Sequence, residues 1–302
     1  MKYEEIRQEM QSLLGLAEPA PGTRRREALR MVLGAGLGVG YASAAGTVMA
    51  QTAIHTPADG LQAGAVSIDV NGFELPAYRA MPEGKRNLPV VLVISEIFGV
   101  HEYIADICRR LAQAGYMAVA PDLFVRQGDP RAYTEMAKLM GEVVSKVPDA
   151  QVMGDLDAAV RWAGANGGDI GKLAITGFCW GGRITWLYAA HAPVKAGVAW
   201  YGRLQGDKSD LQPLHPIDLV SRLKAPVLGL YGGQDSGIPL ASVEAMKAAL
   251  KSGSAAAKAS EFVIYPDAPH AFHADYRPSY REQAAVDGWH RMLDWLRLHG
   301  VA

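Results

Sequence analysis

The stretch Gly177-Phe178-Cys179-Trp180-Gly181 decides the fold of this 302-residue chain. An apolar run at residues 172–176 precedes it and is typical of a strand, while residues 182–190 after it are typical of a helix. Strand, turn and helix in this order are the context of the G-x-S-x-G nucleophile elbow, in which a strained turn presents a serine. Here Cys179 takes the place of that serine. Glycine is expected on both sides of it because larger side chains would collide with the strand and the helix.

Two later loops supply the other members of a catalytic triad, which in such folds follows the order nucleophile, acid, histidine. Residues 225–231 are typical of a strand and lead into a turn that contains Asp235. A second strand candidate at residues 261–265 is followed by the loop with His270. The carboxyl ends of parallel strands meet at one sheet edge, so we predict that Asp235 orients His270 as the base beside Cys179.

Each of these assignments has an alternative. A buried cysteine is commonly a small apolar core residue, and Cys179 could fill the core in this way. Asp235 could be an ordinary turn residue, because aspartate is frequent in turns. His270 could be a loop histidine without a role, and His273 is the other candidate for the base. The order and spacing of the three residues favour the triad.

The rest of the chain predicts a scaffold of α/β class. Residues 65–70 and 75–79 flank Asn71-Gly72, a strong signal for a two-residue hairpin turn. Strands and helices then alternate, which predicts a mostly parallel sheet with helices on both faces. The expected strands are 90–95, 117–120, 173–176 and 196–201, and the expected helices are 103–114, 150–165, 182–190 and 279–299. Residues 127–148 are a candidate for a mobile segment that covers the pocket.

The chain resembles the dienelactone hydrolase family, also called the carboxymethylenebutenolidases. The stretches that carry this resemblance are Ser95–Gly99, Ala120–Phe124, Gly177–Gly182, Trp200–Gly202, Gly232–Asp235 and His270–Phe272. The resemblance implies an α/β-hydrolase fold with a Cys-Asp-His triad. It also implies hydrolysis of carboxylic esters or lactones through a thioester acyl-enzyme. A binder of small carbonyl compounds without turnover and a peptidase are the other functions considered for this fold.

The resemblance also implies a role for Glu96, because the family places a glutamate beside its cysteine, where it controls the protonation and rotamer of the thiol. Physically, a carboxylate near Cys179 can accept its proton, while His270 stabilises the resulting thiolate. The alternative is that Glu96 merely ends the strand at residues 90–94. An acidic side chain straight after such an apolar run suits a pocket better than a packed core.

The oxyanion hole follows from the same elbow geometry. One backbone N–H comes from the residue after the nucleophile, Trp180, and the other from the loop after the third strand, where Ile97 is the expected donor. These donors act on charge that develops in the transition state, and losing one costs about 3–4 kcal/mol in activation free energy.

Substrate contacts are less defined by the sequence. The family binds a substrate carboxylate through arginines, one of them four residues after the histidine, and here that position is Ala274. The substrate therefore stays open within the class of small esters and lactones. The candidate contacts are Arg126, Arg131, Arg203, Arg277, Tyr133, Trp180 and Tyr201. For each arginine the alternative is a solvated surface charge, and for each aromatic residue it is packing.

Composition excludes several functional classes. A net charge of −1, with 49% hydrophobic and 20% charged residues, is that of an ordinary globular protein and gives no case for nucleic acid. The two cysteines, Cys108 and Cys179, are too few for a disulfide framework. His270 and His273 lack the glutamate and the spacing of a zinc-binding helix. We expect no metal and no cofactor, and we expect a monomer.

The N-terminal segment predicts export. A segment rich in arginine, residues 23–30, precedes residues 31–50, which carry no charge and end at the small residue Ala50. Paired arginines indicate the twin-arginine type, although Ala28 stands where an aromatic residue is usual. We predict that residues 1–50 are an export signal and that residues 51–302 form one periplasmic domain without stable membrane association. An uncleaved membrane anchor is the alternative, since twenty uncharged residues can span a bilayer.

Overall fold

The computed structural model describes residues 53–302. They form an eight-stranded sheet with the strand order β1-β2-β4-β3-β5-β6-β7-β8. The strands are β1 (Leu61–Val70), β2 (Phe73–Pro82), β3 (Leu88–Ile94), β4 (Met117–Pro121), β5 (Gly168–Phe178), β6 (Ala196–Trp200), β7 (Val227–Gly232) and β8 (Glu261–Tyr265). β2 pairs antiparallel with β1 and with β4, and every other pairing is parallel. The predicted α/β class with a mostly parallel sheet is confirmed.

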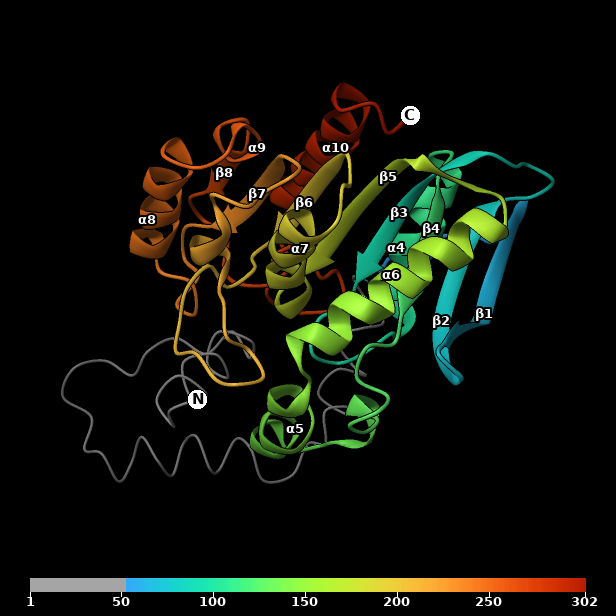
Figure 1. The fold of residues 1–302 in the computed structure, drawn as a ribbon, viewed down its shortest axis with the longest axis horizontal. Helices are drawn as coiled ribbons and strands as arrows, with labels where there is room; N and C mark the ends of the chain where they lie inside the picture. Colours follow the sequence, from blue (N-terminus) through green and yellow to red (C-terminus); the bar gives the residue numbers. More distant parts are fainter. Residues whose placement is uncertain (1–52) are drawn as a thin grey trace.

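Helices cover both faces of this sheet. The α-helices are α4 (Glu102–Gln113), α5 (Met136–Glu142), α6 (Asp149–Ala165), α7 (Trp180–His191), α8 (Leu240–Lys251), α9 (Ala255–Lys258) and α10 (Glu282–Leu298). In Figure 1, α6 and α7 cross the near face of the sheet, and α4 and α10 lie behind it. The strands β3, β4, β6 and β7 are therefore buried over nearly their whole length, which explains their continuous apolar sequences.

The hairpin between β1 and β2 has the predicted turn. Asn71 and Gly72 both have positive φ, 54° and 87°, as a two-residue turn of type I′ requires. Val70 pairs with Phe73 across it. The antiparallel pair lies at one edge of the sheet, away from the strands whose loops carry the predicted triad.

The parallel strands bring the predicted site residues to one edge. Glu96 follows β3, Cys179 follows β5, Asp235 follows β7 and His270 follows β8. These four strands run in the same direction within the continuous series β3-β5-β6-β7-β8, so the loops after their carboxyl ends lie at the same edge of the sheet.

Some boundaries differ from the sequence predictions. β5 begins at Gly168, five residues before the expected start, because residues 168 and 169 already pair with Leu88 and Pro89, ahead of a β-bulge. Residues 127–148 contain α5 and two short 3₁₀ turns. Among residues 53–302 no helix combines the length and apolar character needed to cross a membrane. The predicted export signal, residues 1–50, lies outside the described residues.

Candidate active site

Cys179 sits in a strained turn between β5 and α7, with φ 55° and ψ −114°. The neighbouring glycines explain how the turn fits. A Cβ on Gly177 would lie 2.2 Å from the backbone oxygen of Gly181, and one on Gly181 would lie 2.4 Å from that of Ile94. The Cys179 amide donates to the Trp200 carbonyl at 3.0 Å. Close backbone packing on both sides therefore holds Cys179 in a conformation that a bulky residue rarely adopts.

His270 and Asp235 are in direct contact. The Nδ1 atom of His270 lies 2.7 Å from Oδ2 of Asp235, and both side chains are buried. The other oxygen of Asp235 accepts from the amides of Gly237 and Ile238, at 2.9 and 3.0 Å. These amides fix the carboxylate, and the carboxylate in turn fixes the orientation of the imidazole, as the predicted roles require.

The surroundings of His270 favour its protonated form. Burial disfavours the imidazolium, but the charges of Asp235 and Cys179, with hydrogen bonds to both, outweigh it and raise the pKa of His270 well above its usual value. Since Nδ1 is bonded to Asp235, Nε2 is the nitrogen left for the hydrogen bond with Cys179. An imidazolium in this place stabilises a thiolate on Cys179.

Cys179 and His270 line a cavity of about 350 Å³. Trp180, Tyr201 and Arg203 line it as well, as predicted for pocket residues. Four residues of the segment 127–148 form part of its wall: Met140, Val144, Ser145 and Lys146. The loop at residues 207–212 forms another part. The cavity has the size of small-molecule sites.

Glu96 lies fully buried at the end of β3, where it is held from the loop that follows the histidine. The Tyr276 hydroxyl donates to Glu96 Oε2 at 2.8 Å, and Nη2 of Arg277 lies 3.9 Å from the same oxygen. Tyr276 was not predicted from the sequence, because a tyrosine six residues after a loop histidine carries no recognisable pattern.

The two predicted oxyanion donors lie on adjoining segments. Ile97 is in the turn after β3, and Trp180 is the first residue of α7, whose amide has no acceptor within the helix. Gly181 packs so closely on the backbone oxygens of Ile94 and Ser95 that a Cβ there would lie 2.4 and 2.7 Å from them. The first turn of α7 therefore lies against the end of β3.

Four predicted contacts, Arg126, Arg131, Tyr133 and Arg277, lie outside the lining of this cavity. Arg126 bonds Asp155 at 2.5 Å and stacks over the Phe73 ring at 4.0 Å, toward the β1–β2 edge. Tyr133 interacts with Glu142. Arg131, about half exposed, pairs with Asp129 at 2.7 Å and lies 3.7 Å from Asp122. The expectation that Arg126 and Tyr133 contact substrate in this cavity is not met, because each has a partner elsewhere.

His273, the other candidate for the base, also lies outside the cavity lining. Its Nδ1 atom shares a hydrogen bond of 2.7 Å with the Tyr103 hydroxyl, and its ring packs among Phe178, Trp200 and Trp289. Burial lowers the pKa of His273 well below its usual value. This histidine is a neutral core residue, which leaves His270 as the base candidate at the cavity.

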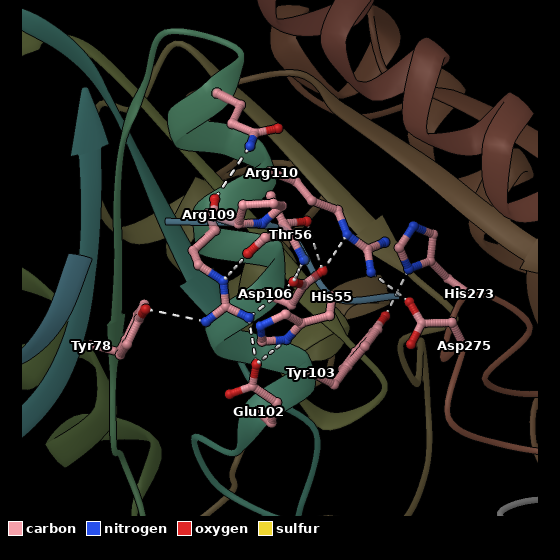
Figure 2. A network of polar contacts seen from close by, with 12 residues as sticks. His55, Thr56, Tyr78, Glu102, Tyr103, Asp106, Arg109, Arg110, His273 and Asp275 are labelled. Carbon is pink, nitrogen blue, oxygen red and sulfur yellow. Dashed lines mark hydrogen bonds and ion pairs between the residues drawn. The ribbon is translucent and has the colours of Figure 1, made fainter. Parts of the chain in front are cut away.

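A buried ion-pair network fastens the loop after His270 to α4 (Figure 2). Arg110 bonds Asp106 within the helix and Asp275 in the loop, each at 2.5 Å. Asp106 also accepts from the Thr56 amide at 2.6 Å, and Arg109 Nε donates to the Thr56 carbonyl at 2.9 Å. The segment before β1 is thereby tied to the same helix. We call these residues the α4 network.

Comparison with known proteins agrees with this geometry. The model of the dienelactone hydrolase family matches residues 75–300. The chain belongs to the dienelactone hydrolase family. Two relatives are both named "Putative carboxymethylenebutenolidase". The protein of Methylorubrum extorquens is 59% identical over 90% of this chain and 94% of its own length. The protein of Escherichia coli is 55% identical over 86% of this chain and 96% of its own length.

A solved structure supports the same assignment. A crystal structure from Klebsiella pneumoniae is titled "Putative Dienelactone Hydrolase" and is 56% identical to this chain. The match covers 78% of this chain and 98% of that chain, with a TM-score of 0.76. The fold is that of the α/β-hydrolases, and the chain is a hydrolase of the ester or lactone type.

Proposed function

We propose that this hydrolase cleaves small carboxylic esters or lactones with Cys179 as its nucleophile, through a thioester acyl-enzyme. The observation that carries the proposal is the position of Cys179. It occupies a strained elbow and lines one cavity with His270, which Asp235 orients at 2.7 Å. Packing alone does not explain the strained backbone of Cys179. It also does not explain why a buried histidine lies where the charge of Cys179 raises its pKa.

The proposed reaction begins with the Cys179 thiolate and the His270 imidazolium. The sulfur attacks the carbonyl carbon, and the electron pair of the C=O bond moves to the oxygen, which the amides of Ile97 and Trp180 receive. The C–O bond to the leaving group then breaks, and His270 protonates the departing oxygen. Water, deprotonated by His270, attacks the thioester, and collapse of the second tetrahedral intermediate releases the acid and restores the thiolate.

Glu96 has a separate part in this proposal. Its Oε2 atom is held by Tyr276, while Oε1 is buried and has no hydrogen-bond partner among the described residues. We propose that this open carboxylate oxygen takes a proton from the thiol as the active site assembles. We expect Glu96→Gln to lower kcat by about 10²-fold, the lower end of the usual contribution of general bases.

Trp180, Tyr201 and Arg203 are the predicted substrate contacts that line the cavity. They extend its wall from Cys179 toward the loop at residues 207–212, which is polar. We propose that the acyl part of the substrate lies near the elbow and that polar groups of the substrate face Arg203. This proposal stays within the class of small molecules, because the cavity of about 350 Å³ would not enclose a folded peptide.

The sequence of residues 1–50 leads to a second, independent proposal, export of the chain by a twin-arginine signal followed by cleavage after Ala50. Fractionation of cells that express the full-length chain tests it. Export predicts periplasmic protein that begins near residue 51, and substitution of the paired Arg24 and Arg25 by lysine should retain it in the cytoplasm. Cytoplasmic protein with residues 1–50 attached would contradict the proposal.

The function is tested by a screen of lactones and aryl esters with the native enzyme and with Cys179→Ser in parallel. Serine has a much higher pKa than cysteine, so the variant should lose most of its activity while its fold is retained. The matched control is Cys108→Ser, at a cysteine buried in α4. Its folded fraction should keep native activity. Full activity in Cys179→Ser, or equal losses in both variants, would contradict a cysteine nucleophile.

A further inference from the structure

Tyr201 carries a buried hydroxyl at the edge of the candidate active site. The residue is fully buried, and its Oη atom has no hydrogen-bond partner of ordinary geometry among residues 53–302. The neighbouring Tyr103 hydroxyl makes a weaker polar contact with it, and is itself bonded to His273 at 2.7 Å. Buried hydroxyls nearly always have a partner of good geometry, so one that lacks such a partner beside Cys179 indicates a group that a ligand completes.

The backbone of Tyr201 is also strained. Its φ is 38°, a conformation that is unusual for a large aromatic residue. The amide of Tyr201 donates to the Leu230 carbonyl at 2.9 Å, and Gly202 packs so tightly on α7 that a Cβ there would lie 2.3 Å from the backbone of Gly182. The structure around β6 thus enforces a costly conformation at a residue that lines the cavity, a pattern typical of functional positions.

The position of the ring relates Tyr201 to the reacting groups. Tyr201 lines the cavity together with Cys179 and His270, and its ring meets that of His270 edge-on, with centroids 5.1 Å apart. Burial and the charge of Glu96 raise the pKa of Tyr201 well above its usual value. The hydroxyl therefore keeps its proton throughout the working range and acts as a hydrogen-bond donor.

We propose that Tyr201 is a further catalytic residue, whose hydroxyl donates a hydrogen bond to the leaving-group oxygen of the ester or lactone. This role rests on the proposed acyl transfer. The amides of Ile97 and Trp180 take the carbonyl oxygen, so the oxygen beside His270 is the one that departs. As the C–O bond breaks, its electron pair moves to that oxygen, His270 supplies the proton and Tyr201 keeps its own. The hydrogen bond strengthens as negative charge grows on the oxygen.

The test is the dependence of kcat/KM on the leaving group in Tyr201→Phe. Esters of one acid with alcohols of rising pKa, from p-nitrophenol through phenol to ethanol, need progressively more help to expel the oxygen. We expect a loss of less than about threefold with the p-nitrophenyl ester and of about 10²-fold with the ethyl ester, the range for one donor to a developing oxyanion. A residue with only a structural role would lower all members of the series equally.

Two variants make the result decisive. Tyr231→Phe is the matched control, because the buried Tyr231 hydroxyl is bonded to the Gly202 carbonyl at 2.8 Å and serves the fold. It should shift the whole series equally. A uniform loss, or no loss, in Tyr201→Phe would overturn the role of Tyr201 alone. Cys179→Ala is measured beside it, and turnover by that variant would overturn the cysteine mechanism instead.

Discussion

Two buried polar clusters of this molecule differ in how completely they are paired. In the α4 network, Asp106 accepts hydrogen bonds from Thr56, Arg109 and Arg110, and Asp275 is paired with Arg110 (Figure 2). Around the cavity, the buried polar atoms without a hydrogen-bond partner of ordinary geometry among the described residues include Glu96 Oε1, Trp180 Nε1 and Tyr201 Oη. Pairing within the protein stabilises the fold, and we propose that the open groups beside Cys179 serve a substrate.

Backbone strain separates the same two regions. Among residues 53–302 five residues other than glycine have positive φ. Asn71 belongs to the hairpin turn and Asn87 to a bend before β3, and asparagine tolerates this conformation. The other three are Cys179, Tyr201 and Ala271. Cys179 and Tyr201 belong to the candidate site, and Ala271 directly follows His270. The α4 network is instead built on a regular helix. Strain is thus concentrated where the chemistry is proposed.

The largest expected effect comes from removing the sulfur. Cys179→Ala should lower kcat by at least about 10⁴-fold, because no other nucleophile is proposed for the cavity. Its free energy of unfolding should fall by only about 1–2 kcal/mol, since the variant loses the contact of the thiol with His270 but keeps the backbone hydrogen bonds that hold the turn. Steady-state kinetics with an aryl ester and urea unfolding measure the two quantities. A parallel loss of stability and activity would mean that Cys179 belongs with the structural region.

The α4 network should show the opposite behaviour. Asp106→Ala removes the buried carboxylate that Arg109 and Arg110 share, although Arg110 keeps Asp275, and we expect a loss of about 3 kcal/mol in the free energy of unfolding, the lower end of the range for a broken buried ion pair. Activity per folded molecule should fall far less than in the cysteine variant. Urea denaturation with activity measured at low denaturant checks this. If Asp106→Ala were as stable as the native chain but inactive, the distinction between the two clusters would be lost.

The His270–Asp235 pair should give a pH-dependent contribution to stability. The pKa of His270 is raised in the folded state above the usual 6.5, so its contribution is fully present below about pH 6.5 and is lost as the pH rises through the folded-state value. The difference in unfolding free energy between the native enzyme and Asp235→Asn should therefore shrink toward alkaline pH. Denaturation curves across this range measure it, and a difference that grows with pH would refute the assignment.

The smallest effect is expected at the surface. Lys247 and Glu244 form an exposed ion pair on α8 at 2.8 Å, with side chains 41% and 60% exposed. Lys247→Ala should change the unfolding free energy by less than about 0.5 kcal/mol and leave kcat unaltered. This variant sets the baseline for the other measurements. A change as large as that of Asp106→Ala would show that burial is not what distinguishes the α4 network.

Local sequence patterns were sufficient to predict an element where the residues of that element alone determine its structure. The hairpin turn at Asn71-Gly72 and the strand Glu261–Tyr265 have the predicted places, because turn chemistry and short apolar runs are local signals. The contact between Asp235 and His270 was also foreseeable, since parallel strands bring the loops after their carboxyl ends to one edge.

Contacts between distant segments were not foreseeable from one sequence. Arg126 was expected at the substrate, but Asp155 on α6 and Phe73 on β2 hold it elsewhere. Tyr276 and the open hydroxyl of Tyr201 emerged only when the loops after β3, β6 and β8 were placed side by side. Such side chains depend on partners up to 180 residues away, and no local periodicity records them.

The most direct test of the cysteine mechanism is the mass of the enzyme during turnover. The native protein is mixed with p-nitrophenyl acetate, quenched in acid within milliseconds and analysed intact and after digestion. The mechanism predicts a single acetyl group on Cys179, labile to hydroxylamine and formed at least as fast as the steady-state rate. An acetyl group on another residue in the reacting enzyme, with Cys179 unmodified, would contradict it.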